Sequence, residues 1–163
     1  MQKGCLRNFN SLFQSVCICA NARKSIYFTD GGRFLPMKYR FNKHYTRDEV
    51  RALLPQIRKW LEQLTQLHQV MERHEKRLGT LMKQGHDACG QTVNDQVRTL
   101  ADVQEILAEF QRRQIFIKDL DRGLVDFPAI IGGREVFLCW EQDEDDVEFW
   151  HDLESGYGGR ERL

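Results

Sequence analysis

Residues 46–83 read TRDEVRALLPQIRKWLEQLTQLHQVMERHEKRLGTLMK, and this stretch decides the fold. It opens with a capping box, because Thr46 and Glu49 can each satisfy a backbone amide that the first helical turn leaves without a partner. Apolar residues then recur at steps of three and four: Val50, Leu53, Leu54, Ile57, Trp60, Leu61, Leu64, Leu67, Met71, Leu78, Leu81 and Met82. This spacing predicts one amphipathic helix over about 47–83, roughly 55 Å long.

A second, shorter helix is predicted over about 93–113, after a polar turn at 84–91. Its apolar stripe consists of Val93, Val97, Leu100, Val103, Leu107 and Phe110. Two helices joined by a short loop pack antiparallel. The second helix, about 32 Å long, therefore covers only the later part of the first. The apolar stripe on residues 50–61 needs another partner.

Short β-type runs follow at 115–117, 124–131, 135–141 and 147–151, which predicts a sheet over about 115–151. Gly132-Gly133 is a two-residue hairpin loop. Counting outward from it, one face carries Val125, Phe127, Ala129, Ile131, Val136, Leu138 and Trp140. We expect a second hairpin through 142–145 to place Val147 opposite Trp140 and Phe149 opposite Leu138, on the same apolar face.

The predicted sheet begins where the second helix ends, beside the uncovered stretch of the first. We therefore expect its apolar face to pack on five residues of the first helix: Leu53, Leu54, Ile57, Trp60 and Leu61. The predicted fold class is α+β, with a long antiparallel helical hairpin packed at one end on a small antiparallel β-meander. These elements form a single domain over 37–163.

Residues 1–36 differ from the rest of the chain. They hold five of the 24 basic residues, one of the 24 acidic residues and three of the five cysteines. We interpret them as a disordered extension or a misassigned start, because Met37 opens a segment that reads as the beginning of a domain. The remaining Cys89 and Cys139 are too few for a disulfide scaffold, which favours the cytoplasm.

The composition excludes several classes of protein. With 163 residues and a formal net charge of zero, the chain lacks the basic surplus that a nucleic-acid-binding protein uses to hold phosphates. It also lacks the run of about 18 to 20 apolar residues that spans a bilayer. Hydrophobic residues at 41% and charged residues at 29% are typical of a globular domain. We therefore expect neither a nucleic-acid nor a membrane partner.

The predicted register places Asp126, Cys139 and Glu148 side by side on the other face of the sheet, flanked by Phe137 and Trp150. Two carboxylates and a thiolate can hold a divalent metal, although this mixture of hard and soft ligands suits no single metal well. The same residues are also what a half-exposed sheet face carries. The irregular ligand set favours this second interpretation.

His151, Asp152 and Glu154 close the last predicted strand. A histidine beside carboxylates can act as a general base or as a metal ligand. Alternatively, His151 ends the buried face and hydrogen-bonds a neighbouring carboxylate. We favour this structural role, because the sequence offers no nucleophile beside the histidine.

Asp119, Asp121 and Arg122 form a tight polar turn with Gly123 ahead of Leu124. The turn is either purely structural, or its side chains converge with the His151 loop in a pocket. The candidate ligand-binding residues are therefore Asp119, Asp121, Arg122, Asp126, Trp150, His151, Asp152 and Glu154. The sequence identifies no catalytic residue, metal or cofactor.

Several of these residues lie in motifs that resemble a known family. KDLDRGLVDFP (118–128), VFLCW (136–140) and FWHDLESGYGGR (149–160) are similar to a bacterial family of unknown function. The stretch 41–55, with its YTxxExxxLLP pattern, resembles the opening of that family. Some members carry the label "division initiation protein". The resemblance covers about 37–163 and implies a bacterial cytoplasmic protein without a known catalytic residue or cofactor.

These observations favour a non-catalytic interaction module. The helical hairpin exposes more apolar surface than one short helix can bury, so we expect it to pair with a second copy or with a partner protein. The alternative is a metal-dependent enzyme or small-ligand binder that uses the C-terminal Asp/Arg/His cluster.

Overall fold

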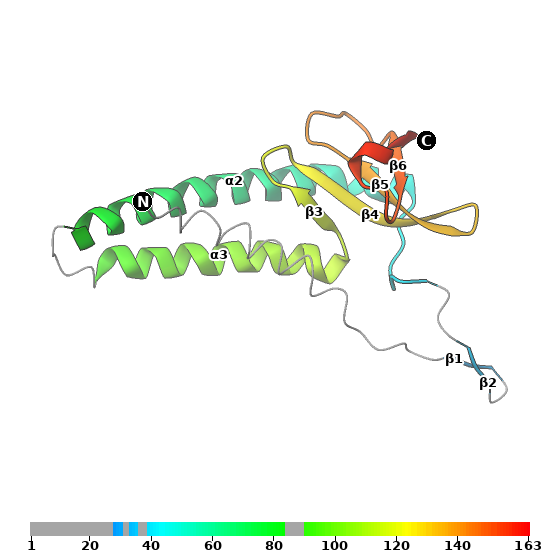
Figure 1. The fold of residues 1–163 in the computed structure, drawn as a ribbon, viewed down its shortest axis with the longest axis horizontal. Helices are drawn as coiled ribbons and strands as arrows, with labels where there is room; N and C mark the ends of the chain where they lie inside the picture. The colour runs from blue at the N-terminus through cyan, green and yellow to red at the C-terminus, as the bar shows by residue number, and fades with distance from the viewer. Residues whose placement is uncertain (1–27, 31–32, 36–38, 84–89) are drawn as a thin grey trace.

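The computed structural model describes residues 28–30, 33–35, 39–83 and 90–163 (Figure 1). Two long helices precede an antiparallel sheet, and a separate two-stranded sheet lies ahead of them. In chain order the elements are β1 (Phe28–Asp30), β2 (Arg33–Leu35), α2 (Arg47–Lys83), α3 (Gln91–Arg113), β3 (Phe116–Asp119), β4 (Leu124–Ile131), β5 (Arg134–Trp140), β6 (Phe149–Asp152), the 3₁₀ turn η2 (Tyr157–Gly159) and β7 (Glu161–Arg162).

Both helices lie where the apolar spacing predicts them, and α3 begins two residues earlier than expected. The capping box at the start of α2 is present. The amide of Thr46 donates to the Glu49 carboxylate at 2.8 Å, and the amide of Glu49 donates to the Thr46 hydroxyl at 3.3 Å. Helix α3 ends at Arg113, and the left-handed backbone of the C-cap residue Gln114 (φ 56°) turns the chain into β3.

The five strands β3 to β7 form an antiparallel meander in which each strand pairs with the next. The hairpin between β4 and β5 has the predicted register, with Val125 opposite Trp140 and Phe127 opposite Leu138. Gly132 and Gly133 make its turn at φ angles of 59° and 75°, which glycine adopts without steric cost. We call the face that carries Val125, Phe127, Ala129, Val136, Leu138 and Trp140 the core face, and the opposite one the outer face.

The predicted register of the second hairpin is wrong by one residue. Cys139 pairs with Phe149, and Leu138 pairs with Trp150. A shift of one residue moves every side chain of a strand to the other face. Trp150 therefore lies on the core face, whereas Phe149 and His151 lie on the outer face. Val147 is buried in the core as expected, but it precedes β6 and takes no part in strand pairing.

An irregular loop at residues 141–148 causes this difference. Arg58 of α2 donates to the carbonyls of Gln142 and Glu144, and the Trp140 indole donates to the Glu144 carbonyl at 3.0 Å. Asp146 is bound by Arg51 at 2.6 Å. The loop therefore makes contacts with a helix that is distant in sequence. Counting residues outward from an expected turn at 142–145 takes no account of these contacts, so it gives the wrong strand register.

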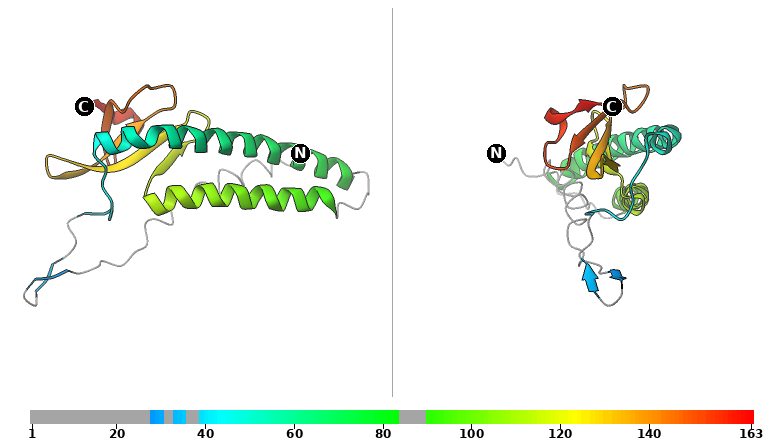
Figure 2. Two further views of the ribbon diagram at one scale, coloured as in Figure 1. Left: turned by 180° about the vertical axis from the view of Figure 1, so that it is seen from behind. Right: turned by 90° about the vertical axis from the view of Figure 1, so that its right-hand side faces the viewer.

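The core face of the sheet packs on the first half of α2, as predicted. One hydrophobic cluster joins Leu54, Ile57 and Leu61 of the helix to Phe127, Leu138 and Trp140 of the sheet, with Leu53 and Trp60 at its margin. Two further views agree that the sheet covers only one end of α2, while α3 runs antiparallel along the rest (Figure 2). The fold class is α+β, a helical hairpin packed at one end on a β-meander.

The prediction for residues 1–36 lies mostly outside the described residues. Within that segment the structure describes only β1 and β2, which pair with each other. Among the residues described, no helix is long and apolar enough to cross a membrane.

Candidate functional site

Three polar side chains are buried together on the outer face of the sheet. Asp126 of β4, Cys139 of β5 and His151 of β6 are 1%, 0% and 2% exposed. Asp126 pairs with Cys139, and His151 pairs with the neighbouring Phe137, so the three side chains meet across adjacent strands. Their carboxylate oxygen, thiol sulfur and ring nitrogen all lie within 4.8 Å of one another. We call these residues the buried triad.

His151 is held by both of its ring nitrogens. Nδ1 lies 2.8 Å from the carbonyl oxygen of Asp152 and donates to it. Nε2 lies 3.2 Å from Oδ2 of Asp126. The hydrogen bond to Asp126 raises the pKa of His151, against the effect of burial. The expectation that His151 hydrogen-bonds a carboxylate is confirmed, although the histidine lies on the outer face.

Cys139 is a free thiol in this cluster. Burial and the nearby Asp126 carboxylate raise the pKa of the Cys139 thiol well above its ordinary value. A cysteine that keeps its proton at neutral pH is a poor nucleophile. Within the residues described, the triad therefore offers no activated nucleophile.

Aromatic rings cover the triad. Phe41, which precedes α2, lies 5.3 Å from Phe116 and 5.3 Å from Phe137 between ring centroids. The backbone amides of Arg40 and Phe41 donate to the Glu135 carboxylate, which fixes this segment on the sheet. The expected half-exposed face is therefore wrong, because the outer face is a second, smaller interior.

Lys118 lies at the margin of the triad. Its Nζ atom is 3.6 Å from Oδ2 of Asp126 and 5.0 Å from the centre of the Phe137 ring. The side chain is 42% exposed. The ammonium group therefore partly balances the Asp126 charge while remaining in contact with solvent.

The eight candidate residues do not form one site. Asp126 and His151 meet in the triad, whereas Trp150 lies on the core face beside Leu138. Among the others, Asp152 lies 3.9 Å from Arg134, and Glu154 lies 3.3 Å from Arg40 at the surface. Glu148, predicted beside Cys139, instead pairs with Arg162 at 3.0 Å.

The turn at 119–123 does not reach His151. Asp119 accepts a hydrogen bond from the amide of Arg122 at 3.1 Å, and Asp121 is exposed. Arg122 instead binds Glu141 through two hydrogen bonds of 2.7 and 2.9 Å. Its guanidinium also stacks 4.2 Å above the Tyr157 ring. The turn thus meets the segment after His151 rather than the histidine itself.

A polar network extends from this contact, and sequence reasoning missed most of it. Arg160 binds Glu144 at 2.6 Å and stacks 4.3 Å above Phe149. The Tyr157 hydroxyl donates to Glu141 at 3.2 Å. The sequence signal for this network is the GYGGR motif at 156–160, which contains Tyr157 and Arg160. Each arginine of the network binds a glutamate, so the charges are balanced in pairs. These contacts hold the end of the chain against the sheet.

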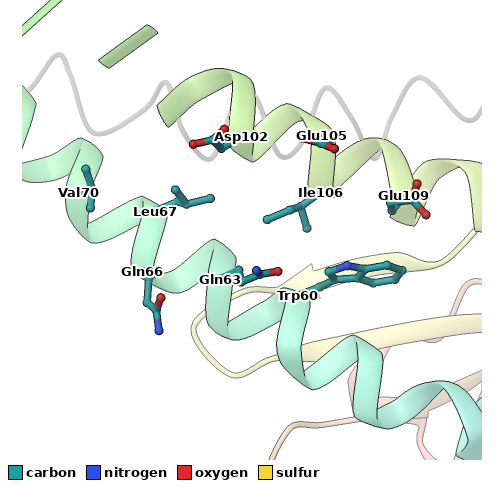
Figure 3. A pocket seen from close by; sticks show the side chains of 9 residues that line it. All are labelled: Trp60, Gln63, Gln66, Leu67, Val70, Asp102, Glu105, Ile106 and Glu109. Atoms are coloured by element: carbon teal, nitrogen blue, oxygen red, sulfur yellow. The ribbon is translucent and has the colours of Figure 1, made fainter. Parts of the chain in front are cut away.

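A groove runs between the two helices, beyond the edge of the sheet (Figure 3). It has a volume of about 570 Å³. Its lining residues are Trp60, Gln63, Gln66, Leu67 and Val70 of α2 and Asp102, Glu105, Ile106 and Glu109 of α3. The floor is apolar, one rim carries amides and the other carries carboxylates. We call this the hairpin groove.

These features define the class of protein: a small α+β domain in which a projecting helical hairpin is joined to a meander with a buried polar cluster. The chain belongs to the family described as an uncharacterized conserved protein (DUF2203), which matches residues 43–163. This confirms the resemblance to a family of unknown function, while the bacterial origin and the division label stay predictions. No curated protein and no solved structure shows significant similarity to the chain.

Proposed function

We infer that the protein is a non-catalytic module that self-associates through its hairpin groove. In the pairing that we favour, two copies place their grooves face to face, with their hairpins antiparallel, to form a four-helix arrangement. The observation that carries this proposal is the self-complementary charge pattern along the groove. Because Cys139 is a free thiol, the proposal places the module in a reducing compartment, the cytoplasm.

The part of the hairpin that extends beyond the sheet has apolar side chains that are only partly buried. All buried residues of α2 lie at or before Leu64, although its apolar spacing continues through the described residues to Met82. Leu67, Val70 and Ile106 remain partly exposed in the groove. An apolar stripe that one neighbour covers incompletely is typical of a helix with a further packing partner.

Charges of opposite sign lie at different levels of the groove face. Gln66 and Val70 line the groove on α2, and helical spacing places Arg73 and Arg77 further along the same side of this helix. Both arginines are exposed. The α3 wall carries the exposed Asp102 and Glu105 closer to the sheet. One end of the groove face is therefore acidic and the other is basic.

The spacing of these charges fits a two-fold axis. Trp60 contacts Phe110 at 5.3 Å between ring centroids, so Asp102 lies level with residues near 68 of the antiparallel α2. We call Asp102 and Glu105 the acidic pair, and Arg73 and Arg77 the basic pair. Measured along α2, the two pairs are then eight to nine residues apart, or roughly 13 Å. The midpoint lies near Val70. An axis there brings the acidic pair of each copy level with the basic pair of the other, across the shared groove.

A second copy fits this face better than an unrelated helix. An isologous interface requires a surface that is complementary to itself after rotation. A purely basic partner would match the carboxylates but would meet Arg73 and Arg77 further along. Only an occupant with the same alternation satisfies both ends, and the chain itself has that alternation.

The test is sedimentation velocity on the full chain at micromolar concentration and moderate salt. We expect a dimer. Two charge-reversed variants, Asp102→Lys with Glu105→Lys and Arg73→Glu with Arg77→Glu, should each be monomeric, because like charges then face each other. Mixing the two variants restores all four attractive contacts, so the mixture should again sediment as a dimer.

A matched control is Lys76→Glu with Lys83→Glu. Both lysines are exposed on α2, but helical spacing places them away from the groove, so this variant should remain dimeric. Circular dichroism checks that each variant keeps its helices. A wild-type chain that is monomeric at high concentration overturns the proposal. A dimer that survives both reversals excludes this face as the interface.

A further inference from the structure

We propose that the buried triad is a zinc site, in which Asp126, Cys139 and His151 bind one Zn²⁺ through a carboxylate oxygen, the thiolate sulfur and Nε2. The inference does not depend on the proposed self-association, because none of the triad residues lines the hairpin groove. Three independent features of the triad support it.

The first feature is the orientation of the His151 ring. Nδ1–H donates to the backbone carbonyl of Asp152, so in the neutral ring the lone pair is on Nε2. Metal-binding histidines typically have this arrangement, in which a carbonyl or carboxylate holds the other ring nitrogen. Nε2 points at the Asp126 carboxylate 3.2 Å away. Two lone pairs face each other there unless a proton or a metal cation lies between them.

The second feature is an unsatisfied oxygen. Asp126 is 1% exposed, and its Oδ1 atom is buried without a hydrogen bond of ordinary geometry among the described residues. The Cys139 thiol, a weak donor, is the group that interacts with this carboxylate from β5. A buried carboxylate oxygen without a partner is unfavourable, because burial removes the water that would otherwise bind it. The Lys118 ammonium lies 3.6 Å from the other oxygen, Oδ2. A cation bound between the three side chains would compensate the buried carboxylate.

The third feature is the donor set. One nitrogen, one sulfur and one oxygen donor suit Zn²⁺, whereas Mg²⁺ and Ca²⁺ prefer oxygen ligands alone. Zinc bond lengths of about 2.0–2.3 Å put tetrahedral donor atoms roughly 3.3–3.8 Å apart. The triad donors already lie within 4.8 Å of one another. Small side-chain rotations therefore complete the site.

The charges also balance. On binding, the Cys139 thiol loses its proton to water as the zinc–sulfur bond forms. One thiolate and one carboxylate then neutralise Zn²⁺, with His151 neutral. Lys118 is the cation nearest to Asp126, and its half-exposed side chain can turn towards solvent. A water molecule then occupies the fourth position.

The probe is the metal itself, added to a full-length chain in which the other four cysteines, at positions 5, 17, 19 and 89, are replaced by serine. We expect one zinc per chain by elemental analysis after dialysis. Titration with Co²⁺ should give the near-ultraviolet charge-transfer absorption of a cobalt–thiolate bond. Because Cys139 is then the only thiol, that absorption assigns it as a ligand.

Two variants and a control complete the test. Cys139→Ser should abolish the cobalt–thiolate absorption, and Asp126→Asn should weaken zinc binding by roughly 100-fold or more. Asp152→Asn should leave binding unchanged, because only the backbone carbonyl of Asp152 contacts His151. If Cys139→Ser does not fold, the cobalt spectrum of the parent chain and the zinc affinity of Asp126→Asn still test the proposal.

Two results overturn the proposal. One is a parent chain with no stoichiometric zinc and no cobalt–thiolate absorption, in which case a proton alone joins His151 to Asp126. The other is zinc binding that both folded variants retain. Sedimentation of the same samples reports self-association separately, so either inference can fail alone.

Discussion

The two halves of α2 have the same apolar spacing but different surroundings. Residues 47–64 include five buried residues, whereas residues 65–83, all of them described, include none. The first half has the core face of the sheet on one side and the end of α3 on another. Among the residues that the structure describes, the second half lies beside α3. The periodicity of a helix therefore indicates which side faces a neighbour, while the number of neighbours decides how deeply that side is buried.

This difference bears on what each half can do. The first half is part of the core and also holds the 141–148 loop through Arg51 and Arg58. The second half contributes little to the core, so its surface is available for a further partner. Substitutions in the two halves should therefore differ in size and in what they change.

The largest effect is expected for Ile57→Ala. Ile57 is fully buried between α2 and the sheet, so its truncation leaves a cavity and should lower the free energy of unfolding by about 2–5 kcal/mol. Leu78→Ala, in the partly exposed second half, should cost less than about 1 kcal/mol. Urea unfolding at concentrations where the chain is monomeric measures both. Equal losses would contradict the contrast between the halves.

A smaller effect is expected for Arg58→Ala. The guanidinium donates to the carbonyls of Gln142 and Glu144 and stacks 4.8 Å above Trp140. Losing these interactions should cost about 2 kcal/mol, since hydrogen bonds from charged groups are worth about 1.5–3 kcal/mol. The neighbouring Lys59→Ala, exposed on the same helix, is the control and should change stability little. Similar values for both would show that the loop is held by other contacts.

The smallest effect is a dependence on pH. Hydrogen bonding from Arg51 is the main reason why the pKa of Asp146 lies well below its ordinary value of 3.8. The ionised carboxylate therefore stabilises the fold above about pH 3.8, and this contribution is lost as the pH falls towards the folded-state pKa.

Asp146→Asn should accordingly cost up to about 1 kcal/mol at pH 7, because the contact is partly exposed to solvent. The difference from wild type should shrink as the pH falls from 5 to about 2 in thermal unfolding. Asp121→Asn, at an exposed turn away from Arg51, is the control. A difference between wild type and Asp146→Asn that stays constant over this range would contradict the role of the Asp146 charge.

Much of the fold could be predicted because its signals are local. The capping box at Thr46, the apolar spacing of both helices and the glycine pair at 132–133 each involve residues close in sequence. The core face of β4 and β5 followed from the same turn. The packing of this face on Ile57 and its neighbours followed from the unequal lengths of the two helices.

The candidate site was predicted only in part. Asp126 and His151 were both named, but the expected register put Glu148 rather than His151 near Cys139. Arg160, Tyr157 and the two glutamates of their network were missed, because their contacts join turns 16 to 19 residues apart in sequence. No local pattern marks such pairs in advance.

By itself, the sequence determined which segments become helices and strands and which of their faces are apolar, since those properties depend on spacing along the chain. Only the tertiary structure decided that Asp126, Cys139 and His151 meet. The reason is that β6 is reached through the irregular 141–148 loop, which Arg51 and Arg58 of α2 contact, and the register of β6 against β5 depends on how this loop folds. One residue of register separates an ordinary sheet surface from a buried cluster of a carboxylate, a thiol and an imidazole.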